Sequence, residues 1–180
     1  MNNRLLASLS LFVPLIGVSA TGFAQTHCAE NKGEITHFSC RIANSNKVES
    51  LCGGYGSPNN PATEWLQYRF GTPGRIEFTY PSTKPDSMKA FEGVYYVKYS
   101  YISYLFINAK ALYEIELSEG NPRIFGIIKV VIDKKEHQLR CSKSVAREYW
   151  DSLIHLSDRT FQDREGENGF QYRYYNSIAK

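Results

Sequence analysis

The four cysteines are the residues of this sequence whose chemistry is most readily predicted. Cys28, Cys40, Cys52 and Cys141 form an even set, which in an oxidising compartment predicts two disulfides with three possible pairings. No two cysteines have a C-x-x-C spacing and no histidine follows at zinc-finger spacing, so we expect no metal site. A catalytic thiol would require an unpaired cysteine and is the less favoured alternative.

One of the three pairings is preferred from the expected strands. If the loop of the first hairpin centres on Asn46, Cys40 and Cys52 lie opposite each other. Cys28 would then bond to Cys141. The other pairings stay open, because a one-residue shift of register would separate the two cysteines.

Two carboxylates and a histidine are the best candidates for hydrolytic chemistry. Glu114 and Glu116 alternate along one predicted strand, and His137 lies in a later one. In a concave site they would serve as acid and base, but alternating charge on an exposed sheet face is commoner. The sequence has no G-x-S-x-G, H-E-x-x-H or dinucleotide motif. We therefore expect no catalytic residues and no cofactor.

The first 24 residues have the order of a secretory signal peptide. Arg4 precedes an apolar run over residues 5–18, and small residues lead to Ala24, where we expect cleavage, with Ala20 as the alternative position. A membrane span needs about 20 apolar residues, so a retained anchor is the weaker alternative. Cys28 lacks the neighbours that a lipoprotein signal requires. We therefore expect a periplasmic or secreted protein without a lipid anchor.

Residues 25–180 are long enough for a single domain with a substantial core. Loss of Arg4 lowers the formal net charge from +3 to +2. This balance gives no electrostatic reason to expect nucleic acid or an anionic membrane as a partner. No apolar run after the signal is long enough to span a bilayer.

Strand-forming residues dominate the chain as far as Cys141, and a helix of about residues 144–157 follows, with a tail over 158–180. The apolar stripe of this helix is expected to pack on a sheet. The fold class is therefore mainly β, an antiparallel barrel or sandwich of about eight strands with one C-terminal helix packed on it. The expected strands cover residues 35–42, 48–52, 65–70, 75–80, 94–107 as one strand or two, 111–117, 124–132 and 137–141.

The tyrosines of the run 94–107 have two interpretations. Tyr95, Tyr99 and Tyr101 share one strand parity, and Tyr96 and Tyr104 share the other. Exposed, they would anchor a protein partner or stack on sugars. Packing across strands and under the helix is the favoured interpretation.

Three short motifs resemble those of a known group of proteins. They are Phe38-Ser39-Cys40, Ser50-Leu51-Cys52 and Leu66-Gln67-Tyr68-Arg69-Phe70-Gly71, followed by Pro73-Gly74. This succession, with a late cysteine, is similar to an uncharacterised family of small exported β-rich proteins of Gram-negative bacteria. The resemblance covers residues 28–81 and Cys141. It implies an exported compartment and a β-rich fold, and it transfers no activity and no catalytic residue.

These observations predict an exported, non-catalytic binding protein with a protein partner in the cell envelope. An inhibitor or immunity protein against an envelope hydrolase or imported toxin would fit. Polar loops over residues 53–63 and 118–123, held on rigid strands, would provide recognition. The alternatives are an envelope carbohydrate-binding or structural module and, less favoured, a hydrolase that uses Glu114, Glu116 and His137.

Overall fold

The computed structural model describes residues 25–55, 64–96, 100–120, 123–145 and 147–160. The expected signal peptide, residues 56–63 of the expected recognition loop, Tyr99 and the tail from residue 161 lie outside the described residues. Within the described residues, no helix combines the length and the apolar character needed to cross a membrane.

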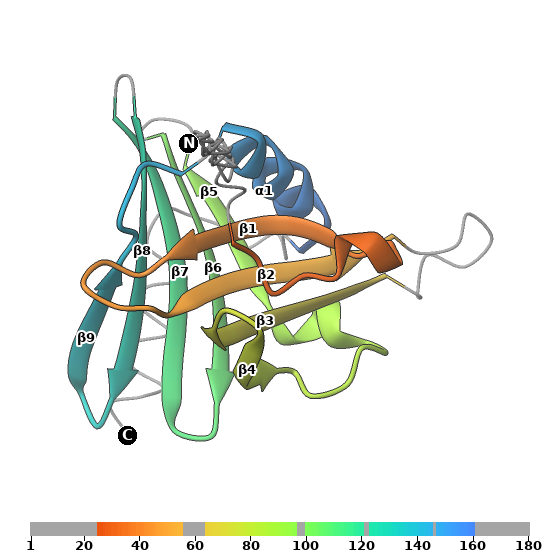
Figure 1. Cartoon of the computed structure of the whole chain (residues 1–180), viewed down its shortest axis with the longest axis horizontal. Helices are drawn as coiled ribbons and strands as arrows, with labels where there is room; N and C mark the ends of the chain where they lie inside the picture. Colours follow the sequence, from red (N-terminus) through yellow and green to blue (C-terminus); the bar gives the residue numbers. More distant parts are fainter. Residues whose placement is uncertain (1–24, 56–63, 97–99, 121–122, 146, 161–180) are drawn as a thin grey trace, which may run out of the picture.

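The described strands form two antiparallel sheets in which each strand pairs with its neighbour in the chain. The first sheet contains β1 (Ile35–Arg41), β2 (Val48–Gly54), β3 (Trp65–Thr72) and β4 (Arg75–Tyr80). The second contains β5 (Glu92–Tyr96), β6 (Tyr101–Asn108), β7 (Ala111–Gly120), β8 (Arg123–Ile132) and β9 (Lys135–Arg140). Figure 1 shows the first sheet lying across the long strands of the second. The predicted mainly β fold is confirmed as a sandwich, and the sheets do not close into a barrel.

The core lies between the inner faces of the two sheets and is rich in aromatic rings. Phe106 of β6 stacks on Tyr80 and on Tyr113 with centroid distances of 4.7 Å. Tyr68 of β3 lies 5.2 Å from Phe106. Strand alternation places these side chains on one face of each sheet, and removal of their apolar surface from water is the main force that joins the sheets.

Helix α1 (Arg147–Thr160) docks on the sandwich, as predicted. Trp150 and Leu153 are buried, and the Tyr104 hydroxyl donates a hydrogen bond to the Leu153 carbonyl at 2.6 Å. The helix begins later than expected, because the Val145 N–H donates to the Ile124 carbonyl at 2.9 Å and keeps that residue in an extended bridge to β8. It also continues beyond residue 157, so the expected tail begins inside the helix.

The aromatic run 94–107 forms two strands rather than one. Ser100, just before β6, has a φ of 44° and belongs to the turn between β5 and β6. Tyr95 packs against Trp150 and Tyr104 is buried in the core, whereas Tyr101 lies on the opposite face of the sheet. The prediction that one alternation of faces continues through residues 94–107 is therefore wrong. The interpretation that the tyrosines pack in the core is confirmed for Tyr95 and Tyr104.

The outer face of the first sheet is covered by the segment that precedes β1. Arg69 of β3 is 7 % exposed and forms a salt bridge of 2.6 Å with Glu34. It also donates to the His27 carbonyl at 2.9 Å. The Ser39 hydroxyl donates to the Gln25 carbonyl at 2.8 Å. These contacts, together with the Cys28–Cys52 disulfide, hold residues 25–34 against the sheet.

The structure contains two disulfides, as expected, but they join different cysteines. Cys28 is bonded to Cys52, and Cys40 is bonded to Cys141. The preferred pairing of Cys40 with Cys52 and of Cys28 with Cys141 is therefore wrong. The part of the chain that the structure describes has no free cysteine.

The position of the first hairpin turn explains this difference. Arg41 pairs with Val48 across the turn, so Cys40 lies opposite Glu49 rather than Cys52. Glu49 and Cys52 are three residues apart on β2 and point to opposite faces. Cys40 therefore faces the core and the second sheet, and Cys52 faces the segment that carries Cys28.

Candidate functional site

Residues 141–145 connect the two sheets directly after β9. The Cys141 N–H donates to the Gly126 carbonyl of β8 at 3.0 Å, and the Ser142 N–H donates to the Arg41 carbonyl of β1 at 2.8 Å. The disulfide between Cys40 and Cys141 lies at this connection. We refer to residues 141–145, with the strand ends that they contact, as the junction.

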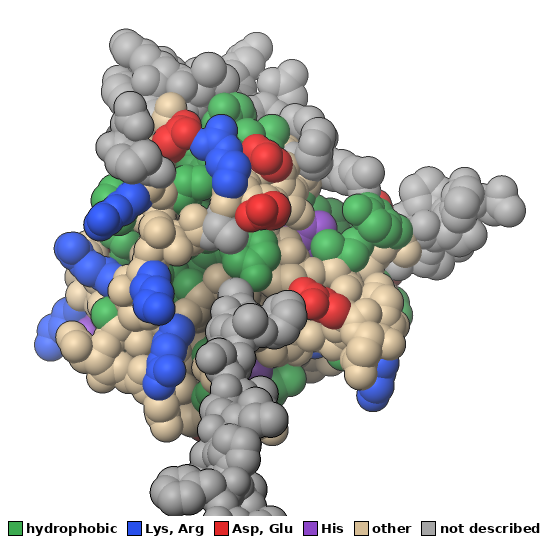
Figure 2. Space-filling model, turned by 45° about the horizontal axis from the view of Figure 1, so that its top comes forward, with side chains coloured by type: hydrophobic (Ala, Val, Ile, Leu, Met, Phe, Trp, Pro, Cys, Tyr) green, Lys and Arg blue, Asp and Glu red, His purple; other side chains and the backbone are tan. Residues whose placement is uncertain are grey.

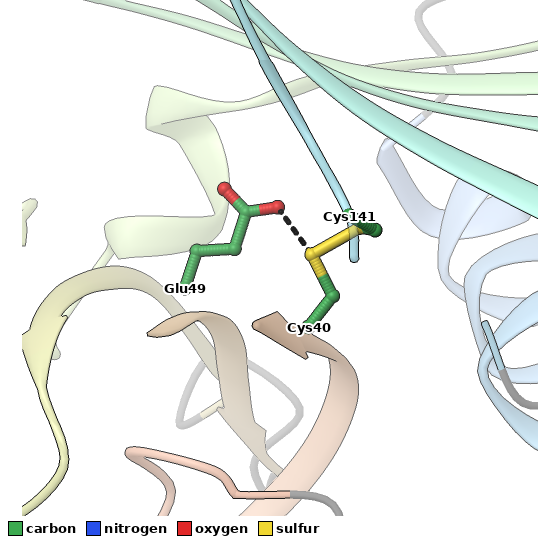
Figure 3. A group of neighbouring side chains, drawn as sticks. All are labelled: Cys40, Glu49 and Cys141. Carbon is green, nitrogen blue, oxygen red and sulfur yellow. Dashed lines mark hydrogen bonds between the residues drawn. A yellow bond between two sulfur atoms is a disulfide. The ribbon is translucent and has the colours of Figure 1, made fainter. Parts of the chain in front are cut away.

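A buried carboxyl group lies against the junction disulfide. Glu49 of β2 is 0 % exposed, and its Oε1 lies 3.2 Å from the Cys40 Sγ (Figure 3). Its Oε2 accepts a hydrogen bond of 3.3 Å from the Tyr68 hydroxyl. A disulfide sulfur carries no hydrogen, so a hydrogen bond at this contact requires the Glu49 carboxyl as its donor.

The electrostatic environment favours the neutral form of this carboxyl. Burial raises the pKa of Glu49 well above its ordinary value, and the Tyr68 hydrogen bond opposes this shift only in part. Burial, followed by the proximity of Glu49, also raises the pKa of the Tyr68 phenol. Burial therefore favours the neutral carboxylic acid, the form that can donate a hydrogen bond to the sulfur.

Cys40, Glu49 and Cys141 lie as close together as the ligands of a metal ion would. One ligand atom each of Cys40, Glu49 and Cys141 lies within 4.8 Å of the others. Both sulfurs are in a disulfide, however, and only a thiolate is an effective metal ligand. With the disulfide formed, the carboxyl is the one remaining donor of this trio, which does not make a metal site.

Two cavities open on the surface beside the junction. One, of about 340 Å³, contains the side chains of Phe125, Cys141 and three cationic residues in its lining. The other, of about 670 Å³, lies next to it and shares Arg123 and Ser144. The cationic residues of the smaller cavity are Arg123, Arg140 and Lys143. Lysine and arginine side chains gather on the side of the molecule where β8 and β9 lie (Figure 2).

In the described part of the two predicted recognition loops, most residues belong to strands, and residues 56–63 and 121–122 lie outside the described residues. Residues 118–120 belong to β7 and Arg123 begins β8, while residues 53–54 belong to β2. Ser118, Glu119 and Arg123 nevertheless line the two cavities. We refer to the surface formed by the lining residues of both cavities as the junction face.

The structure does not assemble the hydrolase arrangement considered from the sequence. Glu114 and Glu116 lie together, but both form ion pairs with Lys129 of β8. His137 pairs with Val130, the residue after Lys129, and so lies on the opposite face of the sheet. The two carboxylates and the histidine therefore share no common site.

The sequence reasoning missed Glu49. Its position in the strand could have indicated burial, because Glu49 lies two residues from the apolar Leu51 and so on the same, buried face of β2. An acid at such a position is uncommon unless it is neutral or paired. Its approach to a disulfide could not be predicted, since that depends on the cysteine pairing.

Comparison with known proteins found no matching family model, no matching curated protein and no matching solved structure. The class that the geometry defines is an antiparallel β sandwich with two disulfides and a docked helix. The disulfides favour an oxidising, exported compartment.

Changing Glu49 to glutamine is expected to raise stability at neutral pH. In the unfolded chain this carboxyl ionises above about pH 4.5, whereas in the folded protein burial keeps it neutral to higher pH. Folding therefore loses free energy as pH rises above that value, and the amide of the variant, which does not ionise, removes the loss. Urea unfolding of both proteins should show a difference at pH 7 that disappears towards pH 4. A variant that is less stable at pH 7 would contradict the neutral carboxyl.

Proposed function

We propose that the protein is an exported, non-catalytic binding protein, periplasmic or secreted, that acts by covering a site on a protein partner. An inhibitor or immunity protein against an envelope hydrolase or toxin is the specific form that we propose. The observation that supports this is the junction face, where two adjoining cavities lie beside an exposed aromatic side chain and a group of cations.

The side chains of the junction face are of the kinds that dominate binding energy. Phe125 is 51 % exposed although it is a large apolar residue, and aromatic and arginine side chains are enriched at binding hot spots. Arg123, Arg140 and Lys143 surround the cavity beside Phe125. A partner with an acidic rim and an apolar centre would complement this surface.

The rigidity of this surface also supports occlusion as its mode of action. The lining residues lie on β7, β8, β9 and the junction, which is fixed by backbone hydrogen bonds and by the Cys40–Cys141 disulfide. A preorganised surface loses little conformational entropy on binding. An inhibitor profits from this property because it must remain bound to its target.

A carbohydrate-binding or structural role is the second candidate. Tyr55 is 74 % exposed at the end of β2 and offers a ring on which a sugar could stack. Sedimentation of the protein with purified peptidoglycan, compared with a Tyr55→Ser variant, tests this role. Sedimentation that depends on Tyr55 would favour it over the inhibitor proposal.

Replacing Phe125 with serine is expected to weaken partner binding by tenfold or more, because truncation of a central anchor costs about 2 kcal/mol. Wild-type protein immobilised and exposed to envelope extract should retain a hydrolase or toxin whose activity is blocked in the complex. Ile76→Ser on β4 is the matched control, since Ile76 is similarly exposed at 45 % but lies in the other sheet. Equal retention on all three proteins, or no loss of hydrolase activity, would refute the proposal.

A further inference from the structure

The two sulfurs of the junction disulfide have different surroundings. Cys141 is partly exposed and lines the cavity of about 340 Å³. The Cys40 sulfur faces inward to the buried Glu49 carboxyl, at 3.2 Å (Figure 3). Cys40 is also partly exposed but is not among the residues that line this cavity. Cys141 is therefore the cysteine of this pair at the cavity, and the Cys40 sulfur is the one with the carboxyl beside it.

We propose that Cys40–Cys141 is a thiol–disulfide exchange site for anionic thiols, in which Cys141 is attacked and Glu49 protonates the departing Cys40. This inference concerns the chemistry of the disulfide and does not depend on the proposed binding function. The substrate class is a small or protein-borne thiol that carries negative charge.

The exchange step is balanced without a further reagent. The incoming thiolate forms a bond to the Cys141 sulfur, and the electron pair of the Cys40–Cys141 bond moves to the Cys40 sulfur. Cys40 takes the Glu49 proton and becomes a thiol, which leaves Glu49 as a carboxylate. A second thiolate of a dithiol substrate can then attack the mixed disulfide. Cys141 departs as a thiolate and the substrate becomes a disulfide. Cys141 and the Glu49 carboxylate then each take one proton from water, which replaces the two protons that the substrate thiols released on ionising.

The Glu49 proton is needed because the leaving sulfur is on the inner side of the sandwich. Attack on Cys141 would otherwise produce a thiolate at Cys40 on the inner side of the sandwich, where an unpaired charge is costly. A carboxylic acid already in contact with the sulfur takes up this charge as the bond breaks, and the carboxylate that results keeps the hydrogen bond from the Tyr68 hydroxyl. The rate of thiol–disulfide exchange depends on how well the leaving sulfur carries or loses its negative charge.

The cavity supplies the attraction for the incoming group. Arg123, Arg140 and Lys143 line it together with Cys141. Cations around a site raise the local concentration of anions and favour the thiolate form of a thiol. Gly126 permits the disulfide to lie close to β8, since a Cβ at this position would stand 2.5 Å from the Cys141 sulfur.

The second disulfide provides an internal control. Cys52 is fully buried and Cys28 is 8 % exposed. Neither lines the two cavities of the junction face. Both disulfides are present in the same molecule. If reduction were unselective, both would open at rates that depend neither on the charge of the thiol nor on Glu49.

The test follows the reaction of the purified protein with reduced glutathione, an anionic thiol, and with cysteamine, a cationic one. Samples are alkylated at intervals and the adducts located by mass spectrometry. We expect glutathione on Cys141 and alkylated Cys40, with Cys28–Cys52 intact. At equal thiolate concentration glutathione should react about tenfold faster than cysteamine. An Arg140→Gln, Lys143→Gln variant should lose this preference.

Replacing Glu49 with glutamine keeps the shape of the side chain but removes the proton, and should slow the exchange about 100-fold at pH 7. In wild-type protein, the rate per thiolate should fall as pH rises through the Glu49 pKa, a dependence absent from the variant. Among the described residues, Tyr68 of β3 contacts the Glu49 carboxyl, and Tyr113 of β7 packs against Tyr68. These two phenols are the titratable groups whose contacts with this site are established.

Several results would overturn the proposal. They are adducts on Cys40 instead of Cys141, earlier opening of Cys28–Cys52, equal rates for the two thiols, or an unchanged rate in the Glu49→Gln protein. If that variant does not fold, the wild-type pH profile decides the role of Glu49, because a rate per thiolate independent of pH excludes it as proton donor.

Discussion

Replacing Cys40 and Cys141 together with alanine is expected to lower the free energy of unfolding by about 5 kcal/mol. The bond joins residues 101 apart in the sequence, and a crosslink stabilises mainly by restricting the unfolded chain, more strongly for longer loops. Urea unfolding monitored by circular dichroism measures the loss. The effect should be large enough to leave the double variant close to its stability limit, since small domains have about 5–15 kcal/mol in total.

The other disulfide is the matched control for this prediction. Cys28 and Cys52 are 24 residues apart, so the corresponding double alanine variant should lose about 3.5 kcal/mol. Equal losses, or a larger loss for the shorter loop, would show that restriction of the unfolded chain does not control the stability. The pairing itself is tested first, by peptide mapping without reduction.

Replacing Arg69 with methionine is expected to cost about 3 kcal/mol. The salt bridge to Glu34 is 2.6 Å long and both side chains are about one-tenth exposed, and removal of one partner leaves a buried charge uncompensated. Lys84 also contacts Glu34, at 3.0 Å, which places the loss at the lower end of the usual range. Lys47→Met, which breaks the more exposed pair with Glu77, should leave the stability nearly unchanged. Equal effects of the two changes would contradict the burial argument.

The same pair predicts a dependence of stability on acid. Although burial opposes it, hydrogen bonds from Arg69, Ala29 and Lys84 lower the pKa of Glu34 from 4.5 to about 2. The pKa of Glu34 is lower in the folded protein than in the unfolded chain. The ionised Glu34 carboxylate therefore contributes its full stabilisation above about pH 4.5, and this contribution is lost as pH falls towards 2. In the Arg69→Met protein this acid dependence should be weaker.

Strand positions could be predicted because they depend on local alternation of side chains. β1–β4 begin within one residue of the expected positions, and the Pro73-Gly74 turn lies between β3 and β4 as expected. Apolar side chains of alternate residues must reach the same core, so the periodicity is present in the sequence itself. The helix was found for the same reason, from the spacing of Trp150 and Leu153.

Features that depend on the exact residue of a turn could not be predicted. A hairpin turn centred between Asn44 and Ser45, instead of at Asn46, changes the partner of Cys40 from Cys52 to Glu49. The break at Ser100 likewise reverses which tyrosines face the core. Small shifts along a strand change every pair and every face, and composition alone does not fix them.

The sequence by itself determined a cysteine-linked, antiparallel β protein with one docked helix, because hydrophobic periodicity and cysteine count are local properties. Only the tertiary structure decided that Cys40 meets Cys141, that Glu49 lies against their bond, and that Arg123 and Arg140 converge beside Cys141. These contacts join residues from different strands, and their distances depend on how the two sheets pack rather than on any single segment.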